Sequence, residues 1–204
     1  PINYGTIKSG TAVSFDGVND YVDTGSTFQS TFRGSHSVSC WVKLDDGRPS
    51  SFNKFIGAKN SSSEDAQYFG VYNDGSLVYY YKSNGNATQR QTSVYFPDGA
   101  TGWTHLVAVA DSTAGNTSWV KIYANGVEVT GGSTDSSSGV TFSDYTSTEN
   151  LYLGTQSFNG SPSSDYFTGD VANVKIFNTL LTEAQIKEQF LNREQILPTG
   201  VSSS

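Results

Sequence analysis

Short runs of β-branched and aromatic residues recur along the chain, separated by clusters of Gly, Asn, Asp or Ser. Such runs, bounded by turn residues, are typical of strands. Strands are expected at residues 11–15, 21–24, 37–44, 54–58, 68–72, 76–82, 93–96, 103–111, 118–124, 127–130, 151–154 and 167–177. Many strands with turn residues at short intervals predict an all-β sandwich or barrel.

Two hairpins are well marked in this pattern. Asn73-Asp74-Gly75 links the strand at 68–72 to the strand at 76–82, and Asn125-Gly126 links the strand at 118–124 to the strand at 127–130. A Gly after Asp or Asn accepts the positive φ that tight hairpin loops require. On either side of Asn125-Gly126 the residues also alternate between two faces, as strands with one buried face do.

One segment near the end of the chain predicts a helix. Thr182 is a good N-cap, and residues 183–191 (EAQIKEQFL) follow it, with Ile186, Phe190 and Leu191 on one apolar stripe. A single short helix docked on the sandwich is expected. The Ser-rich stretch 131–139 predicts a mobile loop, and residues 200–204 predict a flexible tail.

Composition and charge exclude several function classes. Of the 204 residues, 15% are charged and 13% aromatic, and the net charge is −7. The twelve Lys and Arg residues are scattered, which argues against binding to nucleic acid or to an anionic membrane. No apolar run is long enough to span a bilayer, and no signal peptide pattern is present. The single cysteine, Cys40, shares a strand face with Val38 and Val42, which indicates a buried residue rather than a reactive thiol.

Four segments, in this order and spacing, resemble laminin G-like domains of the concanavalin A-like lectin-glucanase superfamily. They are an opening strand pair at 13–22 (VSFDGVNDYV), a Trp-bearing strand at 37–43 (SVSCWVK), a Trp-x-His strand at 103–109 (WTHLVAV) and a closing segment at 169–178 (GDVANVKIFN). The resemblance implies a two-sheet antiparallel jelly-roll sandwich with one short C-terminal helix. We expect residues 1–199 to form a single domain of this type. Trp41 and Trp103 match core positions of the family.

The sequence provides no set of catalytic residues. Glycosidases of this fold carry paired carboxylates on one strand, and the family's Glu-x-Asp-x-x-Glu arrangement is absent here. His36 and His105 are the only histidines, and no Ser or Cys is paired with one of them and an Asp in a recognisable pattern. We therefore expect no enzymatic activity.

A turn near the N-terminus could bind a divalent cation. Asp16, Asn19 and Asp20 fall within five residues around Gly17, and hard oxygen ligands at this spacing suit calcium. The resemblance implies that the last long strand approaches this turn and brings Asp170, or Asp165, near it. The acidic residue that the family usually has after Gly-x-Ile is replaced here by Ala172. The alternative is that Asp16 and Asn19 only make the hydrogen bonds common in turns.

Aromatic residues provide candidates for a glycan site, because sugars stack on aromatic faces and hydrogen-bond to polar side chains. In the segment Tyr79-Tyr80-Tyr81, Tyr79 and Tyr81 share a strand face and Tyr80 takes the other. Ligand-binding candidates are Tyr79 and Tyr81, together with Tyr145, Phe158 and Tyr166 in loops. The alternative for the strand tyrosines is that one face packs in the core and the other forms a cross-strand aromatic pair.

The sequence alone favours the first of two functions and keeps the second as an alternative. The first is a non-catalytic structural module on the surface of a phage or virus particle, with a protein partner, which the polar Ser/Thr/Asn surface and the lack of disulfides favour. The second is a carbohydrate-binding lectin module with a cell-surface glycan as partner, which the fold and the loop tyrosines favour. In either case we expect the protein on a virion or an extracellular surface.

Overall fold

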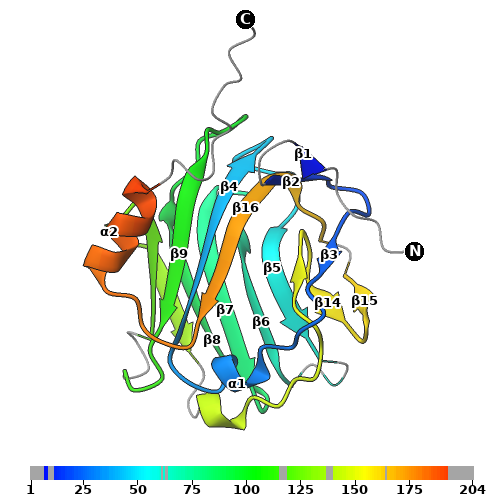
Figure 1. Cartoon of the computed structure of the whole chain (residues 1–204), viewed down its shortest axis with the longest axis vertical. Helices are drawn as coiled ribbons and strands as arrows, with labels where there is room; N and C mark the ends of the chain where they lie inside the picture. The colour runs from blue at the N-terminus through cyan, green and yellow to red at the C-terminus, as the bar shows by residue number, and fades with distance from the viewer. Residues whose placement is uncertain are drawn as a thin grey trace, which may run out of the picture.

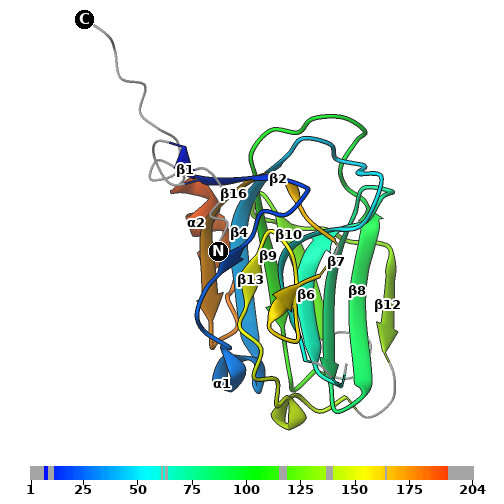
Figure 2. The same ribbon diagram turned by 90° about the vertical axis from the view of Figure 1, so that its right-hand side faces the viewer.

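The computed structural model consists of two β-sheets packed face to face (Figures 1 and 2). It describes residues 7–8, 12–60, 62, 64–114, 119–136, 140–163 and 165–192. All strand pairings are antiparallel among the described residues except that of β14 with β5. The two-sheet jelly-roll sandwich predicted from the sequence is confirmed.

The first sheet has seven strands, named here in spatial order. They are β1 (Ile7–Lys8), β2 (Ala12–Asp16), β16 (Thr168–Phe177), β4 (His36–Leu44), β9 (Thr104–Ala110), β10 (Val120–Ala124) and β11 (Val127–Glu128).

The second sheet has nine strands. Seven follow one path, in the order β12 (Ser133–Ser136), β8 (Asn86–Val94), β7 (Ser76–Ser83), β6 (Ala66–Val71), β5 (Asn53–Lys59), β13 (Tyr152–Leu153) and β3 (Val22–Asp23). The other two are β14 (Ser157–Phe158), which pairs with β5, and β15 (Ser161–Pro162), which pairs with β14.

The core lies between the inner faces of the two sheets. Alternate residues of β4, including Val38, Cys40 and Val42, pack there against Phe69 and Tyr79 of the second sheet. Cys40 is completely buried, as predicted, and burial raises the pKa of its thiol to about 12. Nearly every residue of the central strands β4, β5 and β9 is buried, which explains why their apolar runs located them in the sequence.

Both predicted hairpins are present. β6 pairs with β7 across the turn at Gly75, and β10 pairs with β11 across Asn125 and Gly126. Asn125 has φ 51° and Gly126 has φ 82°, the left-handed pair that a two-residue hairpin loop needs.

Helix α2 (Glu183–Leu191) begins where the sequence predicted it. The Thr182 side chain caps the first turn, and Gln185 completes a reciprocal capping box. The helix packs on the outer face of the first sheet (Figure 1), where Ile186 is fully buried and the ring of Phe190 stacks on Trp41. Leu191 is 61% exposed, so it is not part of this contact.

Among the segments that differ from the sequence-based expectation are one strand and one loop. The strand predicted at 93–96 is in fact β8, which starts seven residues earlier at Asn86. The first part of β8 was not predicted because its residues are mostly polar, and only Thr88 and Thr92 of the strand are buried. Residues 133–136 of the predicted mobile loop form β12, which adds to β8 by backbone pairing. Residues 137–139 of that loop and the predicted tail at 200–204 lie outside the described residues.

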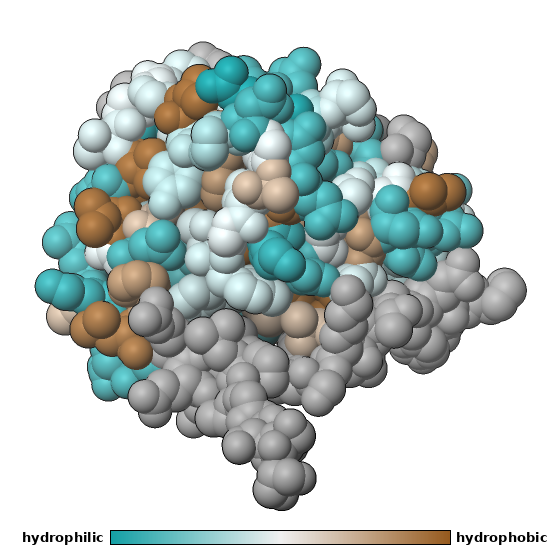
Figure 3. All heavy atoms as spheres, turned by 90° about the horizontal axis from the view of Figure 1, so that it is seen from above, coloured by the Kyte–Doolittle hydropathy of each residue, from teal (hydrophilic) through white to brown (hydrophobic). Residues whose placement is uncertain are grey.

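The two outer faces of the sandwich differ in the helices that cover them. Helix α2 covers part of the first sheet, whereas the short helices α1 (Gln29–Phe32) and η1 (Phe142–Asp144) lie at one end of the molecule (Figure 1). No described helix covers the outer face of the second sheet, and none of the described helices is long and apolar enough to cross a membrane. The end of the molecule seen in Figure 3 shows isolated hydrophobic residues among polar ones.

Candidate functional site

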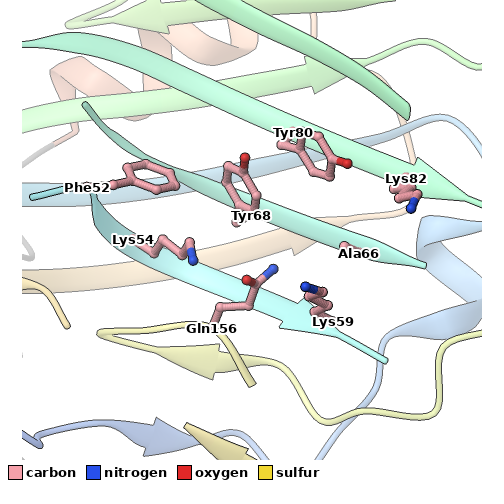
Figure 4. A pocket seen from close by; sticks show the side chains of 8 residues that line it. All are labelled: Phe52, Lys54, Lys59, Ala66, Tyr68, Tyr80, Lys82 and Gln156. Atoms are coloured by element: carbon pink, nitrogen blue, oxygen red, sulfur yellow. The ribbon is translucent and has the colours of Figure 1, made fainter. Parts of the chain in front are cut away.

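An open pocket of about 320 Å³ lies on the outer face of the second sheet (Figure 4). Strands β5, β6 and β7 form its floor, and the segment before β14 forms one side. The lining residues are Phe52, Lys54, Lys59, Ala66, Tyr68, Tyr80, Lys82 and Gln156. Its volume is at the lower end of the range for small-molecule sites.

Strand register brings these residues together. Tyr68 of β6 lies between Gly57 of β5 and Tyr80 of β7. A Cβ atom on Gly57 would lie 2.9 Å from the Cβ atom of Gln156, so only a glycine at this position lets Gln156 lie across the strand. The Gln156 amide group donates to the carbonyl oxygen of Ala58 at 3.3 Å, which fixes the side chain beside the pocket.

Aromatic rings form a row along one side of the pocket (Figure 4). The rings of Tyr68 and Tyr80 stack with centroids 4.7 Å apart and an interplanar angle of 5°. The ring centroids of Phe52 and Tyr68 are 5.1 Å apart, with an interplanar angle of 66°. Because the stacked rings cover one another, the pair offers edges and hydroxyl groups to a ligand more than open faces.

Lys54 is the most deeply placed charge in the pocket. It is only 6% exposed, and its ammonium group pairs with the Asp165 carboxylate at 2.5 Å. The same ammonium lies 5.2 Å from the ring centre of Phe52 and 5.3 Å from that of Tyr68. Burial lowers the pKa of Lys54, while the hydrogen bond and charge of Asp165 act in the opposite direction. The ion pair therefore holds Lys54 against the aromatic row.

The remaining polar groups of the pocket are hydrogen-bond donors or can act as donors. The Lys59 ammonium lies 4.9 Å from the centre of the Phe158 ring, and Lys82 lies on the same strand face as Tyr80. Burial raises the pKa of Tyr68 and of Tyr80, with a further contribution from Tyr72, so both hydroxyls keep their protons at neutral pH. No described lining residue is Asp or Glu, so the pocket itself has no acid–base pair for glycoside hydrolysis.

Three of the predicted ligand-binding tyrosines are core residues instead. Tyr79, Tyr81 and Tyr145 are completely buried. The Tyr81 hydroxyl donates to the carbonyl oxygen of Phe32 at 2.7 Å, and its ring stacks on that of Tyr145 at 5.5 Å. The alternative stated for the strand tyrosines is confirmed, since Tyr79 and Tyr81 fill the sandwich and Tyr80 forms a cross-strand pair with Tyr68 on the outer face.

The other two predicted ligand-binding residues are accessible. Phe158 is 39% exposed and lies beside the pocket under Lys59, while Tyr166 is half-buried. Their role in binding stays a prediction.

The sequence contained one usable signal for the residues that it missed. Lys82 lies two residues after Tyr80, so the two side chains point to the same side of β7. A lysine in a sandwich strand indicates the solvent-facing side. Lys54, which lies in a predicted strand, carried the same signal, whereas Phe52 and Gln156 did not, because they reach the pocket only through the sheet register.

The predicted calcium ligands make other interactions in the structure. The Asp16 carboxylate accepts from the backbone N–H of Val18 at 2.8 Å, and the Asp20 carboxylate accepts from the backbone N–H of Asp16 at 3.2 Å. Asp170 accepts from the Ser14 hydroxyl and pairs with the Lys43 ammonium at 3.6 Å.

No group of three or more His, Cys, Asp or Glu side chains that could hold a metal ion is found in the described part of the chain. Asp165 pairs with Lys54 at the pocket. Calcium binding stays a prediction.

Both histidines lie inside the protein. His36 accepts from the Tyr79 hydroxyl at 2.7 Å through Nε2, because its Nδ1 donates to the carbonyl oxygen of Gly34 at 2.8 Å. His105 lies under helix α2, with Nε2 2.9 Å from the Ser39 hydroxyl. Burial lowers the pKa of each to about 4, and for His105 the charge of Lys175 adds to this effect. Both imidazoles are therefore neutral packing residues.

An antiparallel jelly-roll sandwich with one open outer face defines a lectin-like domain. The chain belongs to the concanavalin A-like lectin/glucanases superfamily, whose model matches residues 16–187. This confirms the resemblance noted in the sequence. Among curated protein sequences no match is found.

Solved structures with this fold include carbohydrate-binding modules. The CBM40 of the Ruminococcus gnavus IT-sialidase matches with a TM-score of 0.68 and 12% identity, over 88% of this chain and 96% of the module. The same module bound to α2,6-sialyllactose matches with a TM-score of 0.66 and 12% identity, over 87% and 95%. Domain 4 of a GH43 extracellular arabinanase from Geobacillus stearothermophilus, in complex with arabinotriose, matches with a TM-score of 0.56 and 23% identity, over 91% and 79%. At these identities the likeness concerns the fold.

Proposed function

We propose that this protein is a non-catalytic carbohydrate-binding module and that its ligand occupies the pocket on the outer face of the second sheet. The observation that carries the proposal is the convergence of hydroxyl, amide and ammonium groups beside a row of aromatic rings. Tyr68 and Tyr80 supply hydroxyls, Gln156 supplies an amide, and Phe52 supplies an apolar edge. Sugars match this mixture, because each ring carries hydroxyls around an apolar C–H surface.

The fold supports the same ligand class. Two structural neighbours were solved with oligosaccharides bound, sialyllactose in one and arabinotriose in the other. Because the identity is low, their binding residues do not transfer to this chain. The sequence also favoured a particle-surface role, and that role stays a prediction that co-purification with virions would test.

Binding to a glycan array, followed by calorimetry on the strongest ligand, tests the proposal. We expect saturable binding that Tyr80→Ala weakens at least tenfold, since this change removes both a hydroxyl and half of the stacked pair. Tyr95→Ala is the matched control, because Tyr95 is also a partly buried tyrosine but lies outside this pocket. Absence of binding across the array, or binding that Tyr80→Ala leaves unchanged, would overturn the proposal.

A further inference from the structure

The pocket concentrates positive charge in an acidic protein. The chain has 12 Lys and Arg residues against 19 Asp and Glu residues, yet three lysines and no described acidic residue line this one pocket. Asp165, which lies beyond the lining, pairs with Lys54 and offsets its charge. Lys59 belongs to no ion pair among the described residues, so its charge leaves the described part of the pocket positive. Such a focus of charge attracts anions.

Lys59 is the ammonium group that is best placed to meet a ligand. The ion pairs among the described residues are Lys43 with Asp170, Lys54 with Asp165 and Lys121 with Glu128, and Lys59 takes part in none of them. It is partly exposed, and its contact with the Phe158 ring holds it at the rim of the pocket. Repulsion from Lys59 also lowers the pKa of Lys54, so the two charges are close enough to oppose each other. An anion between them would relieve this repulsion.

The hydrogen-bonding groups of the pocket select the same chemistry. Ammonium groups only donate, and the neutral Tyr68 and Tyr80 hydroxyls and the Gln156 amide can donate as well. Carboxylates and sulfates only accept, and hydrogen bonds between charged partners are about twice as strong as neutral ones. A neutral sugar would leave Lys59, which belongs to no ion pair among the described residues, without a charged partner. An acidic sugar provides one.

We propose that the ligand of this pocket is an anionic glycan whose acidic group is held by Lys59 beside the Tyr68–Tyr80 pair. This inference rests on the proposed function and narrows its ligand to one class. A sugar carboxylate and a sulfate ester share the required chemistry, and the experiment below separates them.

Calorimetry with matched pairs of oligosaccharides tests the inference. The pairs are 3′-sialyllactose against lactose, trigalacturonate against galactotriose, and a sulfated galactose disaccharide against its unsulfated form. We expect at least one acidic member to bind at least tenfold more tightly than its neutral counterpart. Its affinity should fall as the salt concentration rises, because salt screens exposed charges. Whether a carboxylated or the sulfated member binds identifies the acidic group.

Two lysine variants locate the contact. Lys59→Gln should weaken binding of the acidic ligand at least tenfold, and Lys59→Arg should retain most of it, since Arg also pairs with carboxylate and sulfate. Lys121→Gln is the matched control, because it removes the same charge from an exposed residue of the first sheet. Thermal melting of each variant confirms that it is folded.

The outcomes separate the two proposals. Binding of neutral members as tight as that of acidic ones, lost in Tyr80→Ala, would overturn the anionic ligand and leave the carbohydrate-binding function standing. Tight acidic binding that Lys59→Gln does not change would also overturn the anionic site at this pocket. No binding of any glycan would overturn both.

Discussion

The two buried histidines make stability fall when the pH is lowered from 7 to 4.5. His36 and His105 are the only histidines of the chain, and burial lowers the pKa of each from 6.5 to about 4. In the unfolded chain each imidazole returns to its ordinary pKa, so between pH 6.5 and pH 4 the unfolded state binds more protons. The stability that the neutral histidines provide is complete above pH 6.5 and is lost as the pH falls toward 4.

The size of the effect follows from these two pKa values. Because its pKa shifts from 6.5 to about 4, each histidine lowers the free energy of unfolding at pH 4.5 by about 2 to 3 kcal/mol relative to pH 7. Together the two cost about 5 kcal/mol, which is a large fraction of the stability of a typical domain. Asp74 and Asp111 have lowered pKa values because of hydrogen bonds from Ser76 and Thr113, respectively, and they add to the loss only as the pH falls through their ordinary value of 3.8 and below. The window above pH 4.5 therefore reports mainly on the histidines.

Urea unfolding followed by tryptophan fluorescence at pH 7 and at pH 4.5 measures this difference. His36→Gln and His105→Gln provide the controls, because glutamine does not titrate. Each variant should lose about half of the pH dependence, whatever the substitution does to the stability at pH 7. A wild-type difference below about 1 kcal/mol, or a full pH dependence in both variants, would refute the reasoning.

The remaining predictions concern stability, calcium and catalysis. Asp65→Ala should lower the unfolding free energy by about 3 kcal/mol or more in urea titrations, because the buried carboxylate accepts from the backbone N–H groups of Asn84 and Thr146 and from the Thr146 hydroxyl. Gln67→Leu should raise stability by about 1 to 2 kcal/mol, since both amide atoms of Gln67 are buried with no partner among the described residues; a lower melting temperature would contradict this. If the turn at Asp16 binds calcium, chelation should lower the melting temperature and Asp20→Ala should abolish the response, whereas an unchanged curve would leave only the turn hydrogen bonds. Finally, we expect no hydrolysis on a panel of generic glycosides and esters, and turnover that one Asp or Glu substitution abolishes would disprove this.

The sequence by itself determined the fold and most of the core. In β4, the alternation of Val38, Cys40 and Val42 marks the inward face directly, because a strand turns successive side chains to opposite sides. Thr182 marks the start of α2 for a similarly local reason, since its hydroxyl satisfies a backbone N–H of the first turn. Both features depend on neighbours within a few residues, so the sequence displays them.

Only the tertiary structure decided which aromatic residues form the pocket. Alternation shows that Tyr80 opposes Tyr79 and Tyr81, but either face of a sandwich strand can carry aromatic rings, and the side facing the other sheet is set by long-range packing. Lys54 and Asp165 are 111 residues apart and meet only because β14 adds to the edge of β5. The sequence pattern shows which residues of one strand share a face. Which residues from distant strands share one surface depends on strand order and register, and these are fixed only when the whole sandwich assembles.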